Sequence, residues 1–174
     1  MIGPLIAAVD VNGNVRAAAF IYNPPRNGVL SIPAPSWQPF EPNMSYALSG
    51  GQYFMSDASN IYSASLEVRA GMTLTMLECE IADRSPTQNI TYTFDLRKRD
   101  RLSSSTGTFL TMSGTTSGSI VSGTTAVSLG FSHAVTDATA MYTIFANMQV
   151  SPASVNEFGF FGCRVFYTTT TPMN

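Results

Sequence analysis

The ten residues at 89–98 constrain the fold of this chain more than any other stretch. Their apolar side chains alternate strictly with polar ones: Ile90, Tyr92, Phe94 and Leu96 share one phase, and Thr91, Thr93, Asp95 and Arg97 share the other. This period of two predicts a β-strand with one buried face, because successive side chains of a strand point to opposite faces. The rest of the chain must then supply strands that cover this buried face.

The composition favours an all-β protein. Hydrophobic residues make up 44% of the 174 residues, but only 11% are charged, against about 25% in typical domains. Lys98 is the only lysine, and 20 Ser and 19 Thr provide most of the polarity. The chain therefore lacks the Glu, Lys and Arg from which exposed helices are usually built, whereas Thr, Val, Ile and aromatic residues suit strands.

Short strands are predicted along the whole chain. Apolar runs at 5–11 and 15–21 flank Asn12-Gly13-Asn14, which is a strong signal for a β-hairpin. Further strands are expected at 29–32, 44–48, 52–55, 61–68, 72–81, 89–98, 108–112, 119–129, 140–150 and 158–168. The strand at 72–81 changes phase near Met76–Leu77, which predicts a β-bulge. The pattern predicts a two-sheet antiparallel β-sandwich or jelly roll with an N-terminal β-hairpin arm.

Prolines divide the chain into three parts. Six of the ten prolines fall within residues 23–43, and proline is unsuited to a central strand. We therefore expect a hairpin or anchoring arm at 1–22, a proline-rich connector at 23–43 and a jelly-roll β-sandwich at 44–174. An apolar hairpin on a tether needs a partner surface, so residues 1–22 are expected to contact other proteins of a larger assembly.

Two of the predicted strands are apolar in both phases, although a sandwich strand needs only one buried face. The excess apolar side chains at 140–150 and 158–168 suggest a subunit interface. We expect a homo-oligomer, a homotrimer, whose interface contains Met141, Phe145, Phe161 and Val165.

Cys79 and Cys163 lie far apart in the sequence, and each sits in an apolar strand pattern. We expect two buried free thiols, because free cysteine behaves as a small hydrophobic residue; the alternative, a pairing of the two, stays open. His133 is the only histidine, so a zinc site made with the two cysteines is disfavoured against a hydrogen-bonded loop histidine. No metal or cofactor is predicted.

No catalytic residues are predicted either. Glu78 and Glu80 are two residues apart on one strand, about 7 Å by strand rise, and do not flank a bond from two sides as glycosidase carboxylates do. We interpret them as solvated surface charges. The basic run at 97–101 could bind phosphate or a sulfated sugar, but ion pairs with Glu78, Glu80 or Asp83 on a neighbouring strand are the favoured interpretation.

The net charge of −2 and the pI near 5.2 give no electrostatic basis for binding nucleic acid or an anionic membrane. No apolar run approaches the ~20 residues of a membrane span, and the N-terminus lacks the basic segment of a signal peptide. A weakly charged surface without an export signal suits a virion protein, made in the host cytoplasm and released by lysis. A mature exported protein whose signal has been removed would also fit.

From about Ser31 onward the order of features resembles small β-sandwich modules of phage head-fibre and tail proteins and of bacterial surface proteins. The matching features are Ser-Ile-Pro-Ala-Pro-Ser-Trp-Gln-Pro-Phe at 31–40, Gly71-Met72-Thr73-Leu74, the strand at 89–99 and the ending Phe161-Gly-Cys-Arg-Val-Phe-Tyr167. The resemblance covers about 140 residues, excludes residues 1–30 and is a pattern without a specific motif. It implies a trimeric module with binding or structural roles and no catalytic residues.

The leading hypothesis is a non-enzymatic structural or attachment protein of a virus particle, as a capsid decoration, head fibre or tail component. The alternative is a carbohydrate-binding module of a surface or secreted protein, with aromatic residues aligned on an exposed face. The candidate contacts for a cell-surface glycan or other ligand are Trp37, Tyr46, Tyr53, Tyr62, Arg97 and Arg99. A glycan hydrolase that uses Glu78 or Glu80 is a third, less favoured hypothesis.

Overall fold

A computed structural model of the 174-residue chain shows the fold. It describes residues 6–9, 15–19, 24–40, 46–49, 52–55, 59–85, 88–101, 103, 106–116, 124–137, 139–150 and 157–170. Among these residues, no helix is long and apolar enough to cross a membrane.

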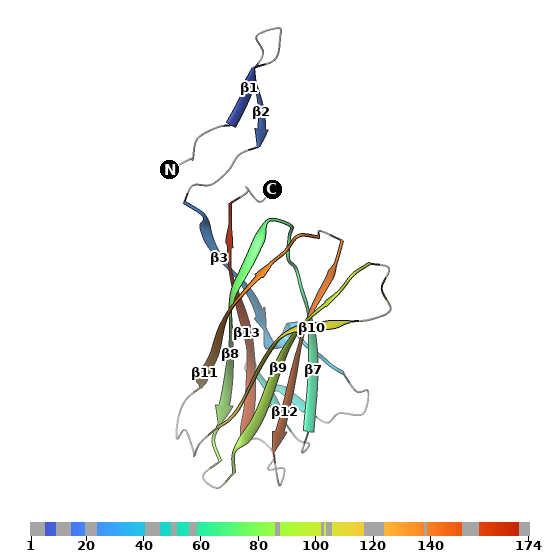
Figure 1. The fold of residues 1–174 in the computed structure, drawn as a ribbon. Helices are drawn as coiled ribbons and strands as arrows, with labels where there is room; N and C mark the ends of the chain where they lie inside the picture. Colours follow the sequence, from blue (N-terminus) through green and yellow to red (C-terminus); the bar gives the residue numbers. More distant parts are fainter. Residues whose placement is uncertain are drawn as a thin grey trace.

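The chain folds into two antiparallel sheets that pack face to face (Figure 1). The five-stranded sheet has the order β10 (Gly107–Thr115), β9 (Ile90–Arg99), β12 (Met141–Val150), β7 (Ser59–Leu66) and β4 (Gln38–Pro39). The six-stranded sheet has the order β11 (Thr125–Ala134), β8 (Met72–Asp83), β13 (Phe158–Thr169), β6 (Gln52–Met55) and β5 (Tyr46–Ser49), and β3 (Arg26–Pro33) pairs with the rest of β13. The predicted all-β sandwich is confirmed.

The predicted N-terminal hairpin is also present. Strands β1 (Ile6–Val9) and β2 (Val15–Ala19) pair antiparallel and form a two-stranded sheet of their own. The turn predicted at Asn12–Asn14 lies outside the described residues.

The alternation of apolar and polar residues at 89–98 positions one face of β9 in the core. Ile90, Phe94 and Leu96 are fully buried, and Tyr92 is partly buried and packs against them. Phe94 contacts Phe160 of the opposite sheet, with 5.9 Å between the ring centroids. The buried phase of β9 is therefore the one that the sequence predicts.

The β-bulge predicted in β8 is confirmed at Thr75. Met76 pairs with Phe166 and Leu74 with Tyr167, so Thr75 is an extra residue on the β8 side. The bulge lets Leu74 and Leu77 both face the core, although they are an odd number of residues apart.

The expected connector at 23–43 differs from the structure, because residues 26–39 form part of the sandwich. The expected edge strand at 29–32 extends over all of β3, and a 3-10 helix, η1 (Ala34–Ser36), and β4 follow it. Trp37 is only 1% exposed, and its Nε1–H donates to the carbonyl oxygen of Ile32 at 3.0 Å. Pro33, Pro35 and Pro39 fit because they lie at strand ends and in η1, where no ladder hydrogen bond is needed.

Gly162 allows this segment to approach β13. Its φ of +125° is unfavourable for residues with a side chain, and a Cβ at this position would collide with the carbonyl oxygen of Ile32. Pro33 lies directly opposite Gly162 in the register of β3 and β13.

The expectation of two free thiols is wrong, because Cys79 and Cys163 form a disulfide. They lie directly opposite each other on the neighbouring strands β8 and β13, with 4.0 Å between their Cα atoms. Both face the core, at 0% and 4% exposure. The separation of 84 residues conceals this proximity, since only the strand order brings the two cysteines together.

Substitution of Phe94 tests the assigned strand phase. Phe94→Ala should lower the free energy of unfolding by about 3–5 kcal/mol, the usual cost of truncating a buried Phe. Thr93→Ala should lower it by less than about 1 kcal/mol, because Thr93 lies on the outer face. Equal shifts of the two variants in a urea melt would contradict the assignment.

Removal of the disulfide is expected to destabilise the fold strongly. A loop of 84 residues is closed, and the chain-entropy relation for a loop of this size gives about 4–5 kcal/mol. The double variant Cys79→Ala/Cys163→Ala should therefore unfold at a clearly lower urea concentration than the oxidised wild type. Unfolding of both proteins at the same urea concentration would show that the disulfide contributes no stability.

Candidate functional site

The outer face of the five-stranded sheet brings together aromatic and polar side chains from four segments. We call this set the β9–β12 face; it consists of Phe40, Asp95, Arg97, Thr111, Phe145 and Asn147. The strand register explains the grouping, because Asp95 of β9 lies opposite both Phe145 of β12 and Thr111 of β10.

Arg97 is held in place by two neighbours on this face. Its guanidinium carbon lies 4.2 Å from the centroid of the Phe145 ring, which is the geometry of a cation–π contact. Its Nη2 is 2.9 Å from Asp95 Oδ2, and the hydroxyl of Thr111 donates to Asp95 Oδ1 at 2.7 Å. The carboxylate therefore fixes the arginine and balances its charge.

Phe40 supplies the exposed aromatic surface of the face. Its backbone N–H donates to the carbonyl oxygen of Ile61 at 2.8 Å, which extends the pairing of β4 with β7. Its ring meets that of Phe145 edge to face, with centroids 5.4 Å apart, and 58% of Phe40 is exposed. A large aromatic side chain is thus presented to solvent in a fixed position.

Two polar atoms of this face have no hydrogen-bond partner among the described residues. These atoms are Arg97 Nε, a donor, and Asn147 Oδ1, an acceptor, and both are shielded from solvent. Unsatisfied buried polar atoms are costly and uncommon in folded proteins. A ligand with hydroxyl groups could satisfy both atoms if a small movement of the two side chains exposes them, because a hydroxyl both donates and accepts.

Arg97 is the one predicted contact residue that belongs to this face. Arg99 lies further along β9, where its Nη2 is 3.4 Å from Met141 Sδ. Trp37 and Tyr62 are buried at 1% and 0% exposure, so neither can form the expected exposed platform. Tyr46 and Tyr53 lie on β5 and β6, and their side chains fall outside the described residues.

The four residues expected at a subunit interface do not share one surface. Val165 is fully buried in the core, which excludes it from an exposed interface. Met141, at 57% exposure, and Phe145 lie on the outer face of the five-stranded sheet, whereas the partly buried Phe161 belongs to the six-stranded sheet. The second apolar phase of β13 is thus explained in part by burial within the sandwich.

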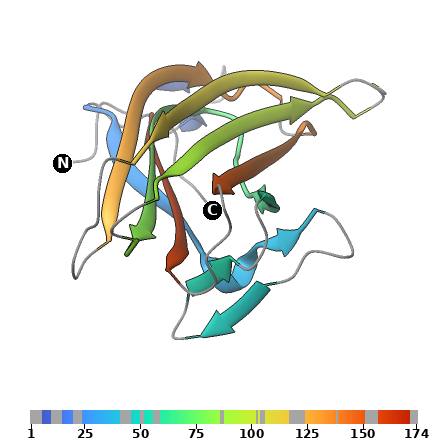
Figure 2. The same ribbon diagram turned by 90° about the horizontal axis from the view of Figure 1, so that it is seen from below.

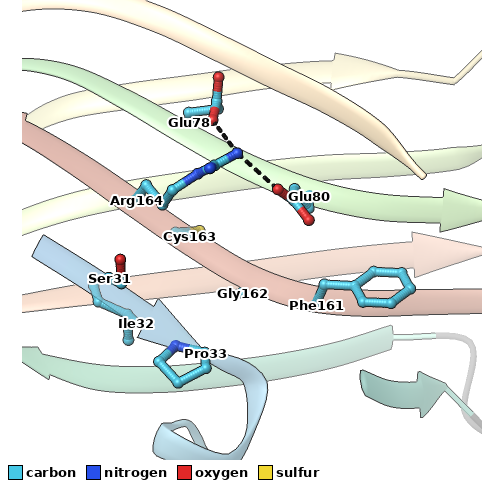
Figure 3. Close-up of a pocket in the computed structure, with 9 residues that line it drawn as sticks. All are labelled: Ser31, Ile32, Pro33, Glu78, Glu80, Phe161, Gly162, Cys163 and Arg164. Atoms are coloured by element: carbon cyan, nitrogen blue, oxygen red, sulfur yellow. Dashed lines mark hydrogen bonds and ion pairs between the residues drawn. The ribbon is translucent and has the colours of Figure 1, made fainter. Parts of the chain in front are cut away.

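Glu78 and Glu80 lie on the outer face of β8, as predicted for surface charges, but their partner differs from the expected one. Both bind Nη2 of Arg164, at 2.7 and 2.8 Å, and all three side chains line a pocket beside β3 (Figure 3). The basic run at 97–101 lies mainly on β9, in the other sheet, and cannot reach them. Within that run, Arg97 pairs with Asp95 and Lys98 pairs with Asp100.

The third expected partner of the basic run, Asp83, is buried. It accepts hydrogen bonds from the backbone N–H of Ser85 and from the hydroxyl of Thr116, and Thr116 Oγ1 accepts from the backbone N–H of Ile90. These contacts join the end of β8 to the five-stranded sheet. No group of His, Cys, Asp and Glu side chains that could hold a metal ion occurs among the described residues.

His133 lies on β11 and not in the expected loop, because the pairing of β11 with β8 continues through Ala134. Its ring stacks on Phe109, with centroids 4.0 Å apart, and its Nε2 lies 3.3 Å from the hydroxyl of Tyr142, which confirms a hydrogen-bonded histidine. Burial lowers the pKa of His133, and the nearby charge of Lys98 lowers it further. With Cys79 and Cys163 in a disulfide, no thiolate is available for a zinc site with His133.

Four residues of this face were not predicted from the sequence as site residues: Phe40, Asp95, Thr111 and Asn147. The sequence shows that the outward-facing positions of β9 are polar, which places Asp95 on the outer face. It does not show that Asp95 fixes the side chain of Arg97. The contribution of Phe40 depends on β4, a strand of two residues that no periodicity reveals.

The lowered pKa of His133 predicts a loss of stability in mild acid. Its folded-state pKa lies below the ordinary value of 6.5, so the unfolded chain binds more protons in this range. The free energy of unfolding should therefore decrease as the pH falls from about 7.5 to about 5.5, and level off below the folded-state pKa. Urea melts of His133→Gln should show a smaller pH dependence; an equal dependence in the variant would contradict the assignment.

No protein-family model matches the sequence, and no curated protein matches it. Solved structures with a similar fold include CBM86, a low-affinity xylan-binding module of Roseburia intestinalis, at 12% identity, 83% coverage of this chain, 96% of that chain and a TM-score of 0.46. TmCBM61 in complex with β-1,4-galactotriose shows 14% identity, coverages of 83% and 88% and a TM-score of 0.38.

The VP2 subviral particle of infectious bursal disease virus shows 15% identity and a TM-score of 0.43, over 97% of this chain but only 37% of that chain. None of the three is a phage head-fibre or tail protein. At these identities the likeness concerns the fold alone.

Proposed function

We propose that this protein is a non-enzymatic attachment protein that binds an oligosaccharide on the β9–β12 face. The observation that carries the proposal is the exposed ring of Phe40 beside a guanidinium group and an amide that each have an unsatisfied atom. An apolar contact surface with a few fixed polar groups is the usual composition of a small-molecule binding site.

The chemistry of a sugar ring suits this arrangement. A pyranose has an apolar C–H face, which can pack on the ring of Phe40, and a rim of hydroxyl groups. A hydroxyl could bond the side chain of Arg97, which is 35% exposed. Others could bond Arg97 Nε and Asn147 Oδ1 once a small movement of the two side chains exposes these shielded atoms. Because Asp95 already fixes Arg97, little side-chain freedom would be lost on binding.

The charge balance of the face favours a neutral glycan over a sulfated one. Arg97 is paired with Asp95 at 2.9 Å, and the carboxylate also accepts from Thr111. An additional anionic group on the ligand would have to compete with this carboxylate for the guanidinium group.

Two further observations support an extracellular protein without catalysis. Disulfides persist in oxidising surroundings, such as the extracellular space or the surface of a virion, which agrees with the Cys79–Cys163 bond. Glu78 and Glu80 both bind one guanidinium group and lie on one strand, which does not suit two carboxylates that flank a glycosidic bond.

A structural component of a virus particle is the second candidate function. The observation that favours it is the hairpin of β1 and β2, which forms a separate sheet and could anchor the sandwich to another protein. An anchoring hairpin and a glycan-binding face are compatible in one attachment protein of a virion.

Binding to an array of neutral and sulfated oligosaccharides tests the leading proposal. Phe40→Ala should weaken the binding of a neutral oligosaccharide about tenfold, or ~1.4 kcal/mol, through the lost ring contact. Val29→Ala is a matched control, because Val29 is an exposed apolar residue, at 45%, on the other sheet. Absence of any glycan binding, or equal binding by Phe40→Ala and wild type, would contradict the proposal.

A further inference from the structure

The N-terminal hairpin lacks a partner within the described part of its own chain. Strands β1 and β2 pair only with each other, and in Figure 1 they lie apart from the two sheets. Their sequences are Ile-Ala-Ala-Val and Val-Arg-Ala-Ala-Ala, which are apolar apart from Arg16. Isolated two-stranded hairpins are only marginally stable in water, so this hairpin requires another surface.

The sandwich offers a suitable surface at the edges formed by β10 and β11. Each is the terminal strand of its sheet, and they lie next to each other in Figure 2. The rings of Phe109 on β10 and Phe131 on β11 are 6.4 Å apart. Neither strand contains Asp, Glu, Lys, Arg or Pro, the residues that usually protect a free strand edge from pairing.

The other terminal strands are less suitable for pairing. β4 has two residues and includes Pro39, and β5 has four residues. β3 carries Arg26 and Pro33. The long, uncharged edge of β11 is therefore the best template for an added strand among the described residues.

A groove between β10 and β11 lies beside this edge. It is lined by Tyr92, Thr111, Met112, Ser113, Val127, Ser128 and Leu129, and none of these side chains is charged. Of these residues, Met112 is buried and Leu129 is 37% exposed. The sequences of β1 and β2, rich in Ala and Val, suit a groove of this character.

The hairpin does not dock on its own chain in this structure. Among the described strands, β1 and β2 pair only with each other, and neither sheet of the sandwich includes them. The β11 edge is therefore available to the hairpin of a second copy.

We propose that the β1–β2 hairpin of one copy adds to the β11 edge of a second copy. The contact is head to tail, because the hairpin and the edge are different surfaces, and it forms a closed ring of copies where the geometry allows closure. This proposal does not depend on glycan binding.

Mass photometry of two variants and their mixture tests the proposal. The wild type should be oligomeric. Deletion of residues 1–22 should give a folded monomer, because the hairpin is absent. Leu129→Lys should also give a folded monomer, because a charge at the exposed edge prevents strand addition. Val29→Lys, the same change at an exposed apolar residue of β3, should leave the oligomer intact.

The mixture separates this contact from other modes of association. The Leu129→Lys protein keeps its hairpin and the deletion variant keeps its edge, so an equimolar mixture should form one-to-one complexes. A monomeric wild type, an oligomeric Leu129→Lys protein with a wild-type melting curve, or a mixture that stays monomeric would each overturn the proposal. If Leu129→Lys fails to fold, Leu129→Ser serves as the edge variant and should weaken association.

Discussion

The packing of Phe160 against three other aromatic rings is the contact on which the two sheets depend. Phe160 belongs to β13, and its ring centroid lies 4.9 Å from that of Trp37, 5.9 Å from that of Phe94 and 6.2 Å from that of Tyr62. Phe94 and Tyr62 belong to the five-stranded sheet, and Trp37 closes one side of the core. The burial of Trp37 also places Phe40, three residues later, beside Phe145 on the outer face.

Much of the fold could be predicted, because single strands carry their own periodicity. The alternation in β9 identified the buried phase of Phe94, and the phase change in β8 identified the bulge at Thr75. The burial of Trp37 and the bond between Cys79 and Cys163 could not be predicted, since both depend on which strands become neighbours. Strand order is a property of the whole chain, and no local pattern encodes it.

The candidate site was predicted only in part for the same reason. Arg97 was identified by the cluster of basic residues, and Phe145 by the excess apolar character of β12. Their contact, at 4.2 Å, requires the register that places Asp95 opposite Phe145. Asn147 is an ordinary polar residue in the sequence, and its importance follows from an acceptor that is shielded in the fold and lacks a partner among the described residues.

The disulfide affects how the chain responds to cleavage by a protease. The segment between Cys79 and Cys163 contains four strands: β9, β10, β11 and β12. A protease that cleaves one peptide bond in a loop between these strands produces two fragments that stay covalently joined. Strand pairing within the two sheets also holds both fragments in place. A copy cleaved once in protease-rich surroundings would therefore persist as one molecule.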